Sequence, residues 1–261
     1  MFDDFKYLFA YTVPLATFFS IFSDGILTFI TPIYTFIFIP TLEAILKERE
    51  TKTIYSEKQI QNKLTNKIFD YLLYGNIPMV FILLISGIYI LSNNSLMTYE
   101  AIGISLSLGI LLATNAINVA HELGHRKSIL DRTLSKILLI PCLYMHFYLE
   151  HNFGHHKNVA TPEDPATSRY NQTVYSFWIT SVFNQYLNAW KIQKDILTRS
   201  KKDFFSFQNE MIWYHLIQFV YLSLIYSLFG LNGLIYAVIT GIISFLFLET
   251  INYIEHYGLV R

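Results

Sequence analysis

The chain has 261 residues, of which 53% are hydrophobic and 15% charged, and its mean hydropathy is +0.37. Soluble domains carry about 25% charged residues, so this composition excludes an ordinary soluble domain and indicates an integral membrane protein. The formal net charge is zero, so the sum says nothing about partners, although no nucleic acid partner is expected of a membrane protein of this kind. The single cysteine, Cys142, excludes an internal disulfide.

Six stretches are long and apolar enough to cross a membrane, since a span needs about 20 mainly apolar residues. They are residues 5–23, 25–46, 70–92, 99–120, 211–229 and 231–252. Short turns rich in Ser, Asn, Asp and Gly join them in pairs. The predicted fold class is therefore an all-α integral membrane protein, with six transmembrane helices in three hairpins and one domain covering residues 1–261.

The basic residues predict the orientation of these spans. Lysine and arginine are absent from the three short turns and concentrate before residue 70 and between residues 126 and 202. Positively charged loops remain in the cytoplasm. We therefore expect both termini, both long loops and the histidine motifs described below on the cytoplasmic side.

Two apolar segments between the fourth and fifth spans are not expected to cross. Residues 134–149 are short for a span and contain Pro141, so we interpret them as an interfacial or re-entrant helix. Cys142 lies in this segment and is expected to be a small packing residue. Residues 174–197 mix aromatic residues with lysines, and we expect them at the cytoplasmic surface.

Six of the eight histidines fall into three short motifs at or near the ends of apolar stretches. They are His121 and His125 in HELGH, His151, His155 and His156 in HNFGHH, and His256 in NYIEHYGL. Imidazole is the commonest metal-binding side chain and suits iron, copper and zinc. These motifs predict metal chemistry at one face of the membrane.

The spacing within the motifs favours two metal ions. Residues four apart share a helix face, so His121 and His125 could hold one ion, and His151 and His155 could repeat that geometry. His156 is turned by about 100° from His155 and could reach a second ion. Metal-bound imidazoles usually donate their other N–H to an oxygen acceptor. The candidate acceptors are Glu122, Glu150, Glu163, Asp164 and Glu255, and Asn252 could also orient a ligand.

Three other polar residues lie within apolar stretches. His146 and His215 are isolated from the motifs, so we interpret both as hydrogen-bonded interfacial residues. A carboxylate inside a span is costly in lipid, which makes Glu249 a candidate functional residue; an interfacial carboxylate near the helix end is an equally good interpretation.

HELGH also satisfies the H-E-x-x-H signature of zinc metalloproteases, in which Glu122 would be the general base. A zinc site needs only one further protein ligand. The chain offers four more clustered histidines, which this alternative leaves unexplained.

The motifs HELGH, EHNFGHHKNVATPEDPATSR and NYIEHYGL resemble those of the membrane alkane 1-monooxygenases, a branch of the integral-membrane di-iron hydroxylase and desaturase superfamily. The resemblance runs from about residue 5 to the last residue. It implies a single membrane hydroxylase domain that uses O2 to convert n-alkanes to 1-alkanols. The electrons would come from rubredoxin and its reductase, and the location would be a bacterial inner membrane.

Carried over to this sequence, the resemblance implies that His121, His125, His151, His155, His156 and His256 bind two iron ions. The family pattern continues with a further box, RHSDHH, which this sequence does not contain. We therefore expect a fragment truncated at its C-terminus that is inactive as a hydroxylase by itself.

Several alternatives stay open. A fatty-acid or lipid desaturase or hydroxylase would use the same scaffold, and a metal-binding remnant would bind metal without turnover. A basic group on the cytoplasmic side could dock rubredoxin, although ordinary positive-inside charge is the favoured interpretation. It comprises Arg126, Lys127, Arg132, Lys157, Lys191 and Lys194. Tyr34, Thr35 and Phe38 could shape a substrate channel, although plain packing is favoured for them.

Overall fold

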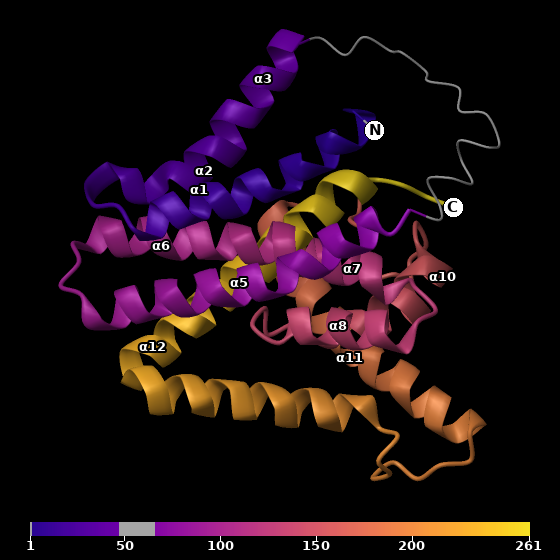
Figure 1. Cartoon of the computed structure of the whole chain (residues 1–261). Coiled ribbons are helices and arrows are strands. Elements are labelled where there is room, and N and C mark those ends of the chain that lie inside the picture. Colours follow the sequence, from indigo (N-terminus) through magenta and orange to yellow (C-terminus); the bar gives the residue numbers. More distant parts are fainter. Residues whose placement is uncertain (1, 47–65) are drawn as a thin grey trace.

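The computed structural model describes residues 2–46 and 66–261, and these ranges contain helices and connecting turns with no β-strand (Figure 1). The first part consists of η1 (Phe2–Tyr11), α1 (Thr12–Ile21), η2 (Gly25–Phe29), α2 (Ile30–Ile33), η3 (Tyr34–Phe38) and α3 (Ile39–Leu46). The second consists of α5 (Ile68–Asn93), α6 (Thr98–Leu111), η4 (Leu112–Ile117), α7 (Asn118–Gly124), α8 (Ile129–Leu139), α9 (Phe147–Glu150), η5 (His151–His155), α10 (His156–Asn158), α11 (Val174–Arg199) and α12 (Glu210–His256). The all-α prediction is confirmed for these residues. Most of the lysines and arginines before residue 70 that predicted the orientation lie outside them.

Four helical stretches have the length and composition of membrane spans: Gly25–Leu46, Ile68–Asn93, Thr98–Gly124 and Glu210–His256. The predicted first span corresponds to a shorter apolar helix, Tyr7–Ile21. The protein is therefore an integral membrane protein with several apolar helices, and four of the described stretches meet the length criterion in place of the six expected.

The predicted fifth and sixth spans together form α12. A straight α-helix of 47 residues would be about 70 Å long, more than twice the thickness of the hydrocarbon core. Gly230 interrupts the helix with φ 66° and ψ −164°, a conformation that glycine adopts readily because it lacks a Cβ. The chain reverses direction at this point, and α12 runs as two arms in Figure 1.

The stretch Thr98–Gly124, formed by α6, η4 and α7, is the most buried of the four span candidates. It pairs with α5 across a short turn and also packs against α1 and α12. α7, α10 and the last turns of α12 lie toward the same end of the molecule (Figure 1). That end carries all three histidine motifs.

The segment predicted as one interfacial or re-entrant helix is instead a helix, an irregular turn and a second helix. α8 ends at Leu139, two residues before Pro141, and α9 begins at Phe147. Cys142 and Tyr144 between them are almost fully buried. Since proline cannot supply the N–H that a continuing helix needs, the chain bends inward here and fills the core.

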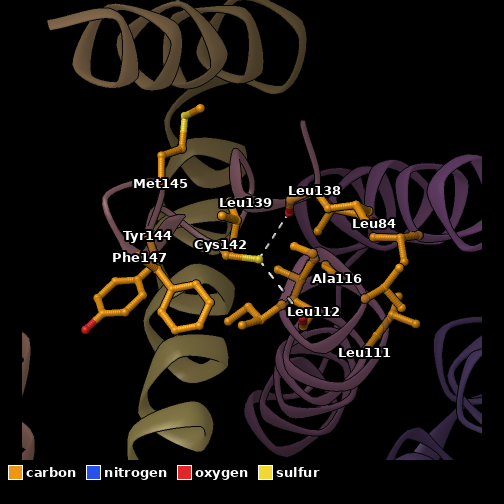
Figure 2. Close-up of a cluster of buried hydrophobic side chains, with 14 of the residues drawn as sticks. Leu84, Leu111, Leu112, Ala116, Leu138, Leu139, Cys142, Tyr144, Met145 and Phe147 are labelled. Atoms are coloured by element: carbon orange, nitrogen blue, oxygen red, sulfur yellow. Dashed lines mark hydrogen bonds between the residues drawn. The ribbon is translucent and has the colours of Figure 1, made fainter. Parts of the chain in front are cut away.

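Cys142 lies at the centre of this packed turn, as expected of a packing residue (Figure 2). Its Sγ lies 3.4 Å from the Leu138 carbonyl oxygen, and Leu111, Leu112 and Ala116 surround it. Burial raises the pKa of its thiol to about 12, so the side chain stays protonated and unreactive.

α11 corresponds to residues 174–197, the segment that was expected at the cytoplasmic surface. The Thr173 hydroxyl accepts a hydrogen bond from the Ser176 N–H and caps its first turn. A buried stripe at intervals of four residues packs against α9 and α12. It consists of Phe177, Ser181, Gln185, Ala189 and Gln193. Two of these buried side chains, Gln185 and Gln193, are amides, so this stripe carries hydrogen-bonding groups into the protein interior.

Candidate metal centre

Four histidines from three helical segments converge on one point. His121 and His125 lie at the end of α7, His151 begins η5, and His156 begins α10. One ring nitrogen from each lies within 4.8 Å of the others. The Nε2 atom of His156 is 3.0 Å from that of His151 and 3.3 Å from that of His125. Such convergent lone pairs suit a shared cation.

The helix spacing explains the first pair. His121 and His125 are four residues apart, so both project from the same face of α7, with ring centroids 4.6 Å apart. The end of α7 is joined to α5 by Arg126, whose Nη1 donates to Asp70 Oδ1 at 2.6 Å. The pair is therefore held at the end of the central buried helix.

The second motif differs from expectation. His151 and His155 were expected to share one ion, but residues His151–His155 form a π-helical turn. Because a π-helix pairs residues five apart, His151 aligns with His156 instead. His155 faces elsewhere: its ring centroid lies 4.9 Å from that of His256.

His155 and His256 form a second, smaller pair of nitrogen donors. The Nδ1 atom of His155 is 3.0 Å from Asp164 Oδ2, so its Nε2 is left as the ligand nitrogen. The Nδ1 atom of His256 is buried and has no hydrogen-bond partner among the described residues. An orphaned imidazole nitrogen beside a carboxylate-oriented one fits a second metal ion, with two of its ligands in place.

Burial favours the neutral form of His151 and of His156. Burial, helped by the neighbouring histidines, lowers the pKa of His151 to about 2. Burial also lowers the pKa of His156. Burial alone would lower the pKa of His155 as well, but its hydrogen bond to Asp164 outweighs this and raises it. Neutral imidazoles present the free lone pairs that a metal requires.

Of the five carboxylates expected to orient the ligands, Asp164 contacts a histidine directly. Glu150 is buried, accepts a hydrogen bond from Asn188 Nδ2 at 3.1 Å, and has its pKa raised to about 7 by burial. Glu122 faces Arg126 at 3.6 Å and is largely exposed. Glu163 lines a polar surface cavity, and Glu255 lines the cavity described below.

Glu249 is fully buried and accepts hydrogen bonds from several donors. Ser181 Oγ donates at 2.6 Å, Gln185 Nε2 at 2.9 Å and Tyr144 O–H at 3.1 Å. Glu249 is therefore enclosed by protein groups and has no exposed surface of its own. The sequence analysis did not identify Gln185, Asn188 or Tyr144 as residues of this site. The available signal was the pair of polar residues Gln185 and Asn188 on or beside the buried stripe of α11.

The two isolated histidines lie apart from the cluster. His215 is hydrogen-bonded as expected, with Nε2 2.9 Å from the Tyr186 hydroxyl and Nδ1 2.6 Å from the Met211 carbonyl oxygen. His146 differs, because its Nε2 is buried and has no partner among the described residues. Burial lowers its pKa to about 3, so the ring is neutral and packs against Tyr144.

The histidines border a cavity of about 680 Å³. Five of the six motif histidines line it: His121, His151, His155, His156 and His256. The remaining wall is mainly apolar and comes from η3, η4 and the second arm of α12. Phe36 and Phe247 stack across it with ring centroids 5.5 Å apart. The site is therefore a group of histidines that could hold metal, facing a mainly apolar cavity.

This geometry disfavours the zinc protease. The signature glutamate, Glu122, would be the general base, and it faces Arg126 at 3.6 Å. His121 and His125 meet two further histidines, whereas a catalytic zinc site usually has three protein ligands.

Comparisons with known proteins agree with these features. The sequence profile of the fatty acid desaturase family matches residues 98–261. The chain is 34% identical over 223 residues to alkane 1-monooxygenase of Pseudomonas putida, covering 85% of this chain and 55% of that protein. It is 36% identical over 231 residues to the Acinetobacter baylyi alkane 1-monooxygenase, covering 88% and 56%. The hydroxylase component of xylene/toluene monooxygenase from P. putida is 30% identical over 162 residues, covering 62% and 44%. The chain spans about half the length of the curated relatives it matches.

Proposed function

This chain belongs to the fatty acid desaturase family, and from that membership we propose that it forms the membrane part of a di-iron alkane 1-monooxygenase. The observation that carries the proposal is the convergence of four imidazoles within 4.8 Å at the wall of an apolar cavity. The relatives named alkane 1-monooxygenase support the substrate class.

The reaction converts an alkane, O2, two electrons and two protons to a 1-alkanol and water. Two bound iron ions would supply the activation of O2 and the cleavage of the terminal C–H bond. His121, His125, His151 and His156 would hold one ion, while His155 and His256 would contribute to the other. Nitrogen-rich ligation suits iron, although copper and zinc accept it too.

The cavity accounts for binding of an uncharged chain. An alkane offers no group for a hydrogen bond or an ion pair, so its affinity comes from burial, at about 0.8 kcal/mol for each CH2 group. The side chains of Phe36, Ile117 and Phe247 supply an apolar wall beside the histidines.

The membrane arrangement is part of the proposal. Six segments would cross the bilayer, with the two arms of α12 and the short helix Tyr7–Ile21 included. Both termini and the metal centre would face the cytoplasm of a bacterial inner membrane, by the positive-inside rule. Rubredoxin, reduced by its reductase, would deliver electrons there. Alkane would arrive through the lipid.

The test is an assay of the full product of the gene, in membranes, with rubredoxin, its reductase, NADPH and n-octane. We expect 1-octanol, and iron near two atoms per chain. His151→Ala should lose octanol formation and about one of the two iron atoms. His215→Phe is the control. Because His215 lies outside the cluster, this variant should keep the iron of the unmodified chain. Zinc in place of iron together with no alcohol would overturn the proposal.

A desaturase or hydroxylase acting on acyl chains is the second candidate, favoured by the description of the matching family. The same preparation, given an acyl lipid in place of octane, distinguishes the two. A double bond or a hydroxyl group in the acyl chain, without octanol formation, would favour this alternative.

A further inference from the structure

A second cavity, of about 600 Å³, lies on the other side of η4 and α7 from the histidines. Its walls come from η1 and α1, from the first turns of α5, and from the stretch between Thr114 and Arg126. Val13, Phe69, Leu72 and Leu73 make most of this wall apolar.

The two cavities share part of a wall. Thr114 and Asn118 line both of them. The Thr114 hydroxyl lies 2.8 Å from both the Ile110 carbonyl oxygen and Asn115 Oδ1, and its single hydrogen donates to one of them at a time. Asn118 is exposed to these spaces, and its side-chain amide has no hydrogen bond among the residues that the structure describes.

An unpaired amide is unusual in a helix of this kind. Thr98–Gly124 is a candidate span, and an unsatisfied polar group costs several kcal/mol in a lipid environment. Asn118 is also one turn before His121, so both side chains project from the same side of α7. A rotation about χ1 would move the amide between the two cavities.

The remaining polar groups of the second cavity are already paired. Asn115 Nδ2 donates to Asn76 Oδ1 at 2.8 Å and to the Ala10 carbonyl oxygen at 2.9 Å. Arg126 is held by Asp70 at 2.6 Å and faces Glu122 at 3.6 Å. The cavity therefore runs from an apolar interior toward a charged rim, with the unpaired Asn118 amide at the wall next to the metal centre.

These features fit an uncharged chain that ends in a hydroxyl group. We propose that the second cavity binds the 1-alkanol product and that Asn118 hydrogen-bonds its hydroxyl, drawing it from the histidine cavity toward the charged rim. An alkane would leave the amide unpaired, so this wall favours product over substrate. The alkanol is a product only through the hydroxylase function proposed above, but its binding at this site does not depend on turnover.

The test is photo-crosslinking in the purified full chain, in lipid nanodiscs, after removal of metal by a chelator. The probes are a medium-chain 1-alkanol and the matching n-alkane, each with a diazirine at the far end of the chain. We expect the alkanol, and not the alkane, to label residues 7–13 and 69–76. Equal labelling by both probes, or labelling confined to residues 247–254 of the histidine cavity, would overturn the proposal.

Two variants sharpen the result. Asn118→Leu should weaken alkanol labelling of the second cavity about fivefold, the factor that one net hydrogen bond contributes. Ala10→Trp should fill the cavity and abolish its labelling while the histidine cavity stays accessible. Asn93→Leu, at the far end of α5, is the matched control. Unchanged labelling in both Asn118→Leu and Ala10→Trp would refute the site.

The outcomes separate this site from the proposed activity. Labelling is measured without metal, so a preparation that makes no octanol can still show a hydroxyl-selective second cavity. In that case the site stands as an alkanol-binding site and the proposed hydroxylation fails. Octanol formation without such labelling would support the proposed hydroxylation and refute the alkanol-binding site.

Discussion

His151 and His156 are five residues apart, and this spacing decides which histidines meet. On a regular α-helix His151 would align with His155, as the sequence predicted. The π-helical turn His151–His155 adds room for one more residue and turns His155 toward Asp164 and His256. One motif therefore supplies both candidate metal positions.

At the scale of single residues, the testable prediction concerns Asp164. Its carboxylate fixes which nitrogen of His155 is free, and loss of such an orienting partner typically weakens metal affinity by about 10- to 100-fold. Asp164→Asn should therefore lower affinity at one of the two metal positions and leave the other intact. Titration of bound metal against a competing chelator measures this.

The matched control is Glu163→Gln, which removes a neighbouring carboxylate that lines the surface cavity. It should bind metal like the unmodified chain. Equal affinity in Asp164→Asn and the unmodified chain would show that Asp164 does not orient a ligand.

At the scale of elements, three π-helical turns border the histidine cavity. They are η3, η4 and η5, and each contributes residues to its wall. π-helical turns arise mainly as single turns within α-helices and are frequent at functional sites. Here the π-helical turns widen the helices where these line the histidine cavity.

A second feature at this scale is the hydrogen-bonded contact between α11 and α12. Glu249 on α12 accepts from Ser181 and Gln185 on α11, and from Tyr144 in the turn before α9. Glu249→Leu would leave these buried donors without an acceptor. We expect a loss of roughly 3 kcal/mol in unfolding free energy, measured by denaturation in detergent.

Glu249→Gln is the matched variant, because its amide oxygen still accepts hydrogen bonds from these donors. Its loss should be clearly smaller than that of Glu249→Leu. If the two variants unfold alike, the hydrogen bonds do not stabilise the packing of α11 on α12.

At the scale of the whole molecule, the metal ions would join segments distant in sequence. The candidate ligands come from α7, from η5 and α10, and from the end of α12. Binding to the folded state alone stabilises it by roughly 3 kcal/mol when free metal is about 100 times Kd. Chelation should therefore lower the melting temperature of the protein.

His151→Ala should show a clearly smaller fall in melting temperature on chelation, because one of its two metal positions has lost a central ligand. His215→Phe should respond to chelator like the unmodified chain. A melting temperature that chelation leaves unchanged in all three proteins would argue against bound metal as a structural link.

Orientation is also a property of the whole molecule. Asn94 lies in the turn between α5 and α6, and Lys202 follows α11. If the positive loops are cytoplasmic, a membrane-impermeant maleimide should label Asn94→Cys in intact cells and Lys202→Cys only after lysis. The unmodified chain should stay unlabelled, because Cys142 is 0% exposed. The reverse pattern would invert the proposed topology.

Local patterns predicted much of this architecture. Hydropathy indicated membrane helices, and the i, i+4 spacing indicated that His121 and His125 share a face; both follow from the fixed geometry of an α-helix. Burial of Cys142 was also expected from its apolar neighbours. The chain reverses at Gly230, within the turn expected between the fifth and sixth spans. The first predicted span is a shorter apolar helix, Tyr7–Ile21, and four of the described stretches meet the length criterion of a span.

The amino-acid sequence by itself determined the membrane class, the all-α fold and the residues that could bind metal, since these depend on composition and short-range periodicity. The tertiary structure alone decided how those residues are grouped. His155 leaves the first cluster because of a π-helical turn, Glu249 is enclosed by donors from α11, and Asn118 faces two cavities. The enclosure of Glu249 and the position of Asn118 result from packing between helices distant in sequence, which no local pattern encodes.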